Sequence, residues 1–349
     1  MVHLARIIAG HPLQFLKFCY SFLTQSLLDL AERIFLPHYP VYQSLRTRIA
    51  RAYLAAAAIH LPDIVHRLPV TACPSGRARK VGDAHWKGYV VPGSHTLQEQ
   101  ESRGKLVVAL YAHGGGYVRG EARQYLNYME RWISVAVNRG IDLVFLSVEY
   151  PLSTEAAHPA QRDSFLAGYR YLLDQGMPTN RVVFMGDSAG AAMSILSATE
   201  LPALNLPQPA CSVLISPWLD TSLSLYAAGG NPLSTTDYVN TANTSVPLMF
   251  GLFLGGKKDG SDPDVNPLCR KPNEMHFLNP QLILTGGAEM AMWDGRRWAH
   301  LCGEAGVSHE LVVEWGQLHI YAMGSKWVER RVREKTEERI ISWIDEWTS

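Results

Sequence analysis

A serine with the surroundings of a catalytic nucleophile lies in the middle of the chain. Residues 182–190 read VVFMGDSAG, an apolar β-rich run that leads into G-x-S-x-G around Ser188 and then into small residues suited to a helix start. A tight strand-to-helix turn projects such a hydroxyl from the carboxyl edge of a sheet, and the helix amides face any negative charge formed there. The alternative is an ordinary turn between a strand and a helix.

A run of glycines follows another apolar run and could supply backbone amides to a reaction at Ser188. Residues 106–111 lead into His113-Gly114-Gly115-Gly116. Acyl transfer develops an oxyanion, which backbone amides can hold where no Cβ blocks the approach. We therefore predict an oxyanion hole formed by the amides of Gly114, Gly115 and Ala189, with His113 in a structural role. A flexible loop would leave the pairing with the serine turn unexplained, and the run lacks the phosphate-binding pattern G-x-x-x-x-G-K-[ST].

The base and acid of a catalytic triad are expected after Ser188, each beyond a later strand. His319 follows the last strand-like run by six residues and is the predicted base. Two carboxylates follow the run 281–285, Glu289 directly after it and Asp294 five residues further on. A carboxylate must orient the imidazole and stabilise its charged form, and either residue can do so. We favour Glu289 and keep Asp294 as the alternative acid, since Asp294 could equally cap the helix that follows.

The elements that must position these residues alternate between strand-like and helical stretches. This alternation is typical of an α/β fold, a mostly parallel sheet covered by helices on both faces. Residues 327–347 are predicted to form an amphipathic helix that packs on the sheet. The predicted parallel strands are 106–111, 143–148, 182–185, 212–215, 281–285 and 310–313, with 86–91 as an antiparallel edge strand.

Two stretches interrupt the alternation and are predicted to form a cap. Residues 1–75 are helical in pattern, and about 218–277 is an insertion in the catalytic domain, which we assign to residues 76–349. Between Lys17 and Asp29 the uncharged run is too short for the ~20 apolar residues of a membrane span. We expect an N-terminal amphipathic helix that belongs to the cap or makes peripheral contact with a membrane surface.

Charge and cysteine usage narrow the classes of partner. The formal net charge is +0 at pH 7, so the chain lacks the one-signed field that binds phosphate backbones, and we expect no nucleic-acid partner. The 5 cysteines are scattered, without metal-ligand spacing or the density of a disulfide scaffold. We expect no metal, no cofactor and a cytoplasmic location. The oligomeric state is left open.

Together the motifs resemble the hormone-sensitive-lipase-like branch of the α/β-hydrolases, over roughly residues 107–321. The resemblance is carried by residues 113–116 and 186–190, by SVEYPL at 147–152 with HPA at 158–160, and by SPWLD at 216–220. It implies an α/β-hydrolase fold with a helical cap, a triad of serine, acid and histidine, and an apolar acyl pocket under N-terminal helices. The chain has Glu289-Met290-Ala291 where the family has Asp-Pro-Leu, so the acid stays open.

We therefore predict a serine carboxylic-ester hydrolase, an esterase or deacetylase that acts through an acyl-enzyme on a small, largely apolar ester. An acyltransferase or an amide hydrolase would use the same triad. A small-molecule receptor without turnover, as in the plant hormone receptors of this family, would have lost the base, whereas His319 is present. A deacetylase tethered to a membrane by the N-terminal helix is a further alternative.

Overall fold

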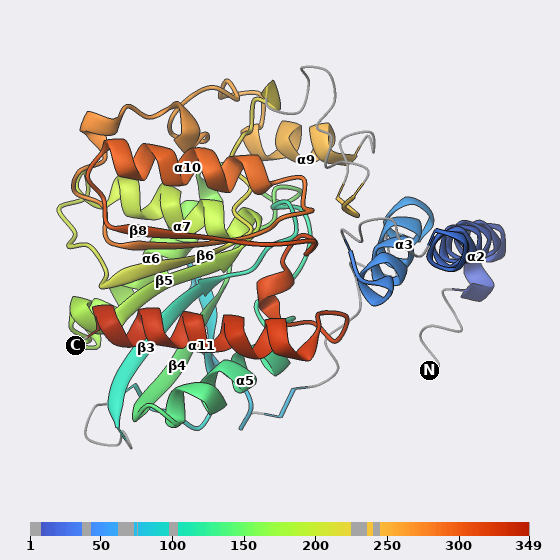
Figure 1. The fold of residues 1–349 in the computed structure, drawn as a ribbon. Coiled ribbons are helices and arrows are strands. Elements are labelled where there is room, and N and C mark those ends of the chain that lie inside the picture. Colours follow the sequence, from blue (N-terminus) through green and yellow to red (C-terminus); the bar gives the residue numbers. More distant parts are fainter. Residues whose placement is uncertain are drawn as a thin grey trace.

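A twisted eight-stranded sheet forms the centre of the described molecule (Figure 1). The computed structural model describes residues 8–36, 43–61, 73–74, 76–97, 104–224, 236–239 and 245–348. Strands β3 to β8 run parallel to one another, while β2 is antiparallel to both β1 and β4. Across the sheet the order is β1 (Arg79–Gly82), β2 (Lys87–Val91), β4 (Ile141–Glu149), β3 (Lys105–Ala112), β5 (Val182–Asp187), β6 (Cys211–Ile215), β7 (Gln281–Gly286) and β8 (His309–Glu314).

All six predicted parallel strands are present, each slightly longer than predicted. Strands β5, β6 and β7 are buried along their whole length, as expected where helices cover both faces of a parallel sheet. The prediction of an edge strand at 86–91 was wrong in one respect. That segment forms β2, but β1 lies outside it. Strand β1 is short and only half buried, so its sequence contains no apolar run from which a strand could be predicted.

Helices cover the two faces of the sheet as separate groups. Helices α6 (Ala160–Asp174), α7 (Ala189–Glu200) and α10 (Met292–Glu304) contribute to one hydrophobic core, and α5 (Leu126–Val137) and α11 (Arg330–Trp347) to the other. Figure 1 shows α10 and α11 on opposite sides of the strands. Helix α11 is the amphipathic helix predicted at 327–347, and it buries Ile340, Ile341 and Ile344.

Parts of both predicted cap segments lie beside this body. Helices α2 (Pro12–Phe35) and α3 (Leu45–His60) form an N-terminal hairpin, and α9 (Ser245–Leu254) lies in the insertion. The Ser44 hydroxyl caps α3 by accepting a hydrogen bond from the Thr47 amide at 3.1 Å. The hydroxyls of Ser44 and Thr47 both donate to the carboxylate of Glu329, the residue before α11. Residues 1–7, 37–42, 62–72, 75, 225–235 and 240–244 of these segments lie outside the described residues. Among the helices that are described, none is both long and apolar enough to cross a bilayer.

Candidate active site

Ser188 occupies a strained turn between β5 and α7. Its φ of 53° and ψ of −120° are rare for a residue with a side chain, and its amide is held by the Ile215 carbonyl at 2.8 Å. The flanking glycines make the turn possible, because a Cβ on Gly190 would lie 2.0 Å from the Ala112 carbonyl oxygen and one on Gly186 would lie 2.4 Å from Gly190. The sequence folds here so that the Ser188 hydroxyl is presented at the carboxyl edge of the sheet.

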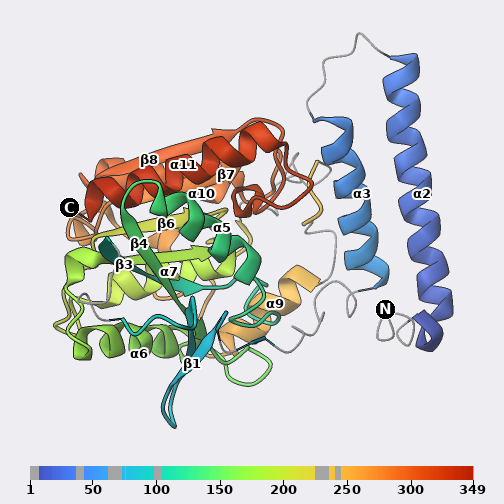
Figure 2. The same ribbon diagram turned by 90° about the horizontal axis from the view of Figure 1, so that it is seen from below.

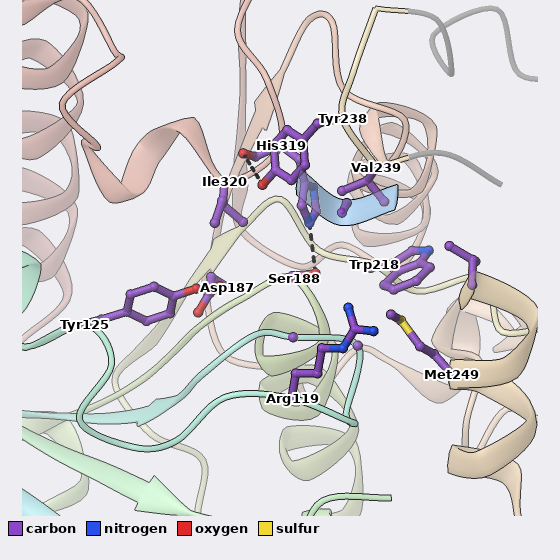
Figure 3. A pocket seen from close by; sticks show the side chains of 14 residues that line it. Arg119, Tyr125, Asp187, Ser188, Trp218, Tyr238, Val239, Met249, His319 and Ile320 are labelled. Atoms are coloured by element: carbon purple, nitrogen blue, oxygen red, sulfur yellow. Dashed lines mark hydrogen bonds between the residues drawn. The ribbon is translucent and has the colours of Figure 1, made fainter. Parts of the chain in front are cut away.

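The structure brings Ser188, His319 and Glu289 into one line of hydrogen bonds. Nε2 of His319 lies 2.9 Å from the Ser188 hydroxyl, as Figure 3 shows, and Nδ1 lies 3.0 Å from Oε2 of Glu289. Glu289 follows β7 and His319 follows β8, so both reach the same sheet edge as the nucleophile. With its proton on Nδ1, the imidazole donates to Glu289 and leaves Nε2 to accept the proton of the serine.

Asp294, the alternative acid, contacts a different segment. Its Oδ2 accepts hydrogen bonds from the amides of Leu219 at 2.7 Å and Asp220 at 3.1 Å. The side chain is fully buried at the start of α10. Asp294 therefore braces the SPWLD segment after β6, whereas Glu289 is the carboxylate that faces the imidazole.

The prediction that the Gly114 amide faces the oxyanion needs correction. That amide donates a hydrogen bond to Oδ1 of Asp187 at 2.9 Å, so its hydrogen does not point toward a substrate oxyanion. The glycines that line the pocket are Gly115 and Gly116, both with positive φ. A left-handed backbone at both positions turns the loop after β3 toward Ser188, which is possible because β3 and β5 are neighbours in the sheet. Ala189, at the first position of α7, offers a further amide beside the nucleophile.

Asp187 ties the glycine loop to the nucleophile turn. Besides the Gly114 amide, its carboxylate accepts from the hydroxyls of Tyr111 at 2.6 Å and Tyr125 at 3.1 Å. Burial raises the pKa of Asp187 to about 6, although these three hydrogen bonds and the nearby His319 oppose the rise. The side chain therefore holds the glycine loop and the nucleophile turn in register by accepting hydrogen bonds.

Asp237 is a residue near the site that the sequence did not single out. Its carboxylate accepts hydrogen bonds from the amides of Met290 at 3.0 Å and His319 at 3.3 Å. Met290 is the residue after Glu289, so Asp237 contacts both the loop of the predicted acid and the loop of the predicted base. Burial raises the pKa of Asp237 to about 6, with His319 lowering it. Its only sequence signal was a lone aspartate in a polar loop. Nothing in the linear pattern related that loop to the ends of β7 and β8.

The electrostatic setting of His319 favours its charged form. Burial lowers the pKa of this imidazole, but the hydrogen bond and charge of Glu289, with the charges of Asp237 and Asp187, outweigh burial and raise the pKa overall. His113, by contrast, is buried against the ring of Tyr150 and its pKa falls to about 4, so it stays neutral. The raised pKa of His319 suits a residue that takes up a proton, whereas the lowered pKa of His113 suits a ring with a structural role.

A pocket of about 170 Å³ opens onto Ser188. Its walls are largely apolar (Figure 3). One part of the wall comes from the loops around Ser188 and His319, and the other part comes from the segments predicted as cap. Helix α3 contributes Ala58, and the insertion contributes Trp218, Tyr238, Val246 and Met249. A cavity of roughly 150 Å³ accepts a molecule the size of benzene, so the space fits a short acyl group.

The comparison with protein families settles where the chain belongs. A family described as alpha/beta hydrolase fold matches residues 109–323, which include the turn at Ser188, the glycine loop and the loops that carry Glu289 and His319. The chain belongs to the α/β-hydrolase fold family. This α/β-hydrolase has the fold class predicted from the sequence, with the mostly parallel sheet described above.

Several relatives are hydrolases of esters. This α/β-hydrolase is 37% identical over 217 residues to an acetyl-hydrolase of Streptomyces hygroscopicus, covering 61% of this chain and 67% of that protein. It is 27% identical over 227 residues to an ethyl acetate hydrolase of Pseudomonas putida, covering 62% and 66%. The solved structure of the HSL-homolog EstE7 from a metagenome library matches with a TM-score of 0.67 at 25% identity, covering 86% of this chain and 93% of that one.

These relatives confirm two predictions made from the sequence. The chain is a member of the hormone-sensitive-lipase-like branch, and it is a carboxylesterase-type hydrolase that acts on small-molecule esters. The similarity to these proteins does not identify the catalytic residues of this chain or the ester on which it acts.

Proposed function

We propose that Ser188, His319 and Glu289 form the catalytic triad and hydrolyse a carboxylic ester through an acyl-enzyme. His319 Nε2 takes the proton of Ser188 as the serine oxygen attacks the ester carbonyl carbon. The oxyanion accepts hydrogen bonds from the amides of Gly115, Gly116 and Ala189. The imidazolium then gives its proton to the leaving alcohol as the carbon–oxygen bond breaks, and a water activated by the same imidazole releases the acid.

The observation that carries this proposal is the continuous line from Glu289 Oε2 through the imidazole to the Ser188 hydroxyl, with separations of 3.0 and 2.9 Å. These separations are within reach of proton transfer. The positive end of α7 and the fully buried Glu289 add electrostatic stabilisation in a site shielded from water.

We further propose that the acyl group is short, with acetyl as the best candidate. The pocket of about 170 Å³ supports this, as do the acetyl and acetate esters named for two relatives. Residues 1–75 and about 218–277 would act as a cap, because Ala58, Val246 and Met249 line the acyl space. A cytoplasmic location and contact with a membrane surface stay predictions.

A series of p-nitrophenyl esters of increasing acyl length tests both parts. We expect kcat/KM to be highest for the acetyl to butyryl esters and to fall for longer chains. Ser188→Ala should lose turnover and labelling by a fluorophosphonate, whereas Ser194→Ala should keep both. Ser194 is the matched control, because it is a buried serine on α7 whose hydroxyl donates to the Gly190 carbonyl at 3.1 Å. Labelling of Ser188→Ala at the wild-type rate would refute the nucleophile assignment.

Hydrolysis and acyl transfer share the triad, so the products must separate them. With p-nitrophenyl acetate and an added acceptor alcohol, we expect free acetate as the main product. Acetylated alcohol as the dominant product in dilute acceptor would show that the site works as an acyltransferase.

A further inference from the structure

Helix α2 carries a stripe of large apolar side chains that the rest of the described chain does not cover. Seven of them, each between 42% and 73% exposed, recur at alternating spacings of three and four residues along the 24-residue helix. This set, the α2 seam, consists of Leu13, Leu16, Tyr20, Leu23, Leu27, Leu30 and Ile34. Single exposed apolar residues are common on proteins, but a continuous row of seven marks an interaction surface.

A different face of α2 is already used within the molecule. Phe18 and Phe22 pack edge-on against Tyr53 of α3, with ring centroids 5.6 and 5.8 Å apart. Asp29, fully buried, forms an ion pair with Arg48 of α3 at 2.6 Å. These contacts fix the rotation of α2 about its axis. The seam is therefore held away from α3, and α3 in turn separates α2 from the α/β body (Figure 2).

The spacing indicates what kind of surface the seam fits. A strict alternation of three and four residues gives a narrow stripe with a period of 3.5, which is the a/d pattern of a helix that pairs with another helix. The three positions corresponding to d, Leu16, Leu23 and Leu30, are all leucine. The b, c and f positions lie on the opposite side of such a helix, and they supply the contacts with α3, through Ser21 at b, Phe22 and Asp29 at c, and Phe18 at f.

A lipid surface fits α2 less well. Helices that lie on membranes carry a basic polar face and often tryptophan. Of the charged residues of α2, Asp29 and Glu32 pair with Arg48 of α3, which leaves Lys17 and Arg33 as its basic residues, and the helix contains no tryptophan. Attraction to anionic lipid would be weak, whereas a second apolar stripe of the same kind would be fully complementary.

We propose that the chain forms a homodimer in which the α2 seams of two copies pair with each other. The residues flanking the seam are small or uncharged along its middle, namely Cys19, Thr24, Ser26 and Ala31, so two helices can approach without like charges meeting. The seven exposed side chains run along the whole 24-residue helix, so pairing would remove a continuous apolar stripe of each copy from water at once. In both ribbon views α2 is the outermost element, so the two bodies need not collide (Figures 1 and 2).

Light scattering coupled to size-exclusion chromatography tests the proposal on the full chain. We expect wild type to elute with twice the mass of the chain and the double variant Leu16→Glu, Leu23→Glu to elute with the mass of one chain. Leu28→Glu is the matched control, because Leu28 is 55% exposed on the same helix but outside the seam. It should remain dimeric. All three positions are exposed, so glutamate there leaves the packing of α2 on α3 intact.

Three results would overturn the proposal. Wild type could be monomeric throughout an accessible concentration series, the double variant could stay dimeric, or Leu28→Glu could dissociate as readily as the double variant. Flotation with vesicles of phosphatidylcholine and phosphatidylserine adds a direct comparison. A wild-type monomer that floats with the vesicles, while the double variant does not, would assign the seam to lipid instead of to a second copy.

Discussion

Replacing Glu289 by glutamine removes the charge that faces Nδ1 of His319 and keeps the shape of the side chain. The carboxylate lies 3.0 Å from Nδ1 and is fully buried. At that separation, an effective dielectric constant of about 20 gives roughly 5 kcal/mol of stabilisation to the imidazolium. A neutral hydrogen bond from the amide oxygen recovers about 1 kcal/mol. The remaining loss of about 4 kcal/mol corresponds to a fall in kcat of roughly a thousandfold.

The assay is steady-state hydrolysis of p-nitrophenyl acetate across pH. We expect kcat of Glu289→Gln to fall as calculated while KM changes little, because the carboxylate acts on the transition state and does not touch the ester. The pKa of His319 should fall as well, since the hydrogen bond and charge of Glu289 are what raise it against burial. The acidic limb of the pH profile should therefore move to lower pH.

Asp294→Asn is the matched control for this change. It is also a carboxylate-to-amide substitution at a fully buried side chain, but its partners are the Leu219 and Asp220 amides. We expect a lower melting temperature, from the loss of about 1.5–3 kcal/mol of charged hydrogen bonding. Its kcat should stay within about tenfold of wild type. If Asp294→Asn were the inactive variant and Glu289→Gln kept more than a tenth of kcat, the assignment of the acid would be refuted.

Three more predictions address the surroundings of the triad. The kcat/KM of wild type should rise with pH through the raised pKa of His319, because only the neutral imidazole accepts the serine proton. Asp237→Asn should move that rise to lower pH with plateau kcat within about threefold, because the charge of Asp237 is one of the causes that raise the pKa of His319. An unmoved profile would contradict this charge effect. Gly114→Ala should lower both melting temperature and kcat, because its Cβ would lie 2.4 Å from Oδ2 and 2.8 Å from the carbonyl oxygen of Asp187; wild-type values for both would show that the loops are not locked.

The sequence was sufficient where one residue type and its immediate neighbours determine the structure. Each parallel strand is a long apolar run, and the turn at Ser188 needs small residues on both sides, so both could be predicted from linear pattern. Strand β1 could not, because an exposed four-residue strand is determined by pairing with β2 and not by its own composition.

Within the site, the errors concern contacts between segments distant in the chain. The glycine run predicted amides near the oxyanion, but the side chain of Asp187, 73 positions after Gly114, decides which amide is already used. Glu289 lies three residues and Asp294 eight residues after the end of β7, so both fall within reach of the same sheet edge. Only the direction in which each side chain points, toward His319 or toward Leu219, distinguishes them.

The arrangement separates the parts that perform the reaction from those that select the ester. The proposed nucleophile, base, acid and oxyanion amides all lie at the carboxyl ends of β3, β5, β7 and β8, where the buried sheet fixes their relative positions. The wall that meets the acyl group comes instead from α3 and α9, through Ala58, Val246 and Met249. Helix α3 is also the support of α2 and its seam. We therefore expect a change in pairing at α2 to alter the acyl space through α3 and to change KM for longer esters. The distances between Ser188, His319 and Glu289 are set by the sheet, so kcat for acetyl esters should stay unchanged.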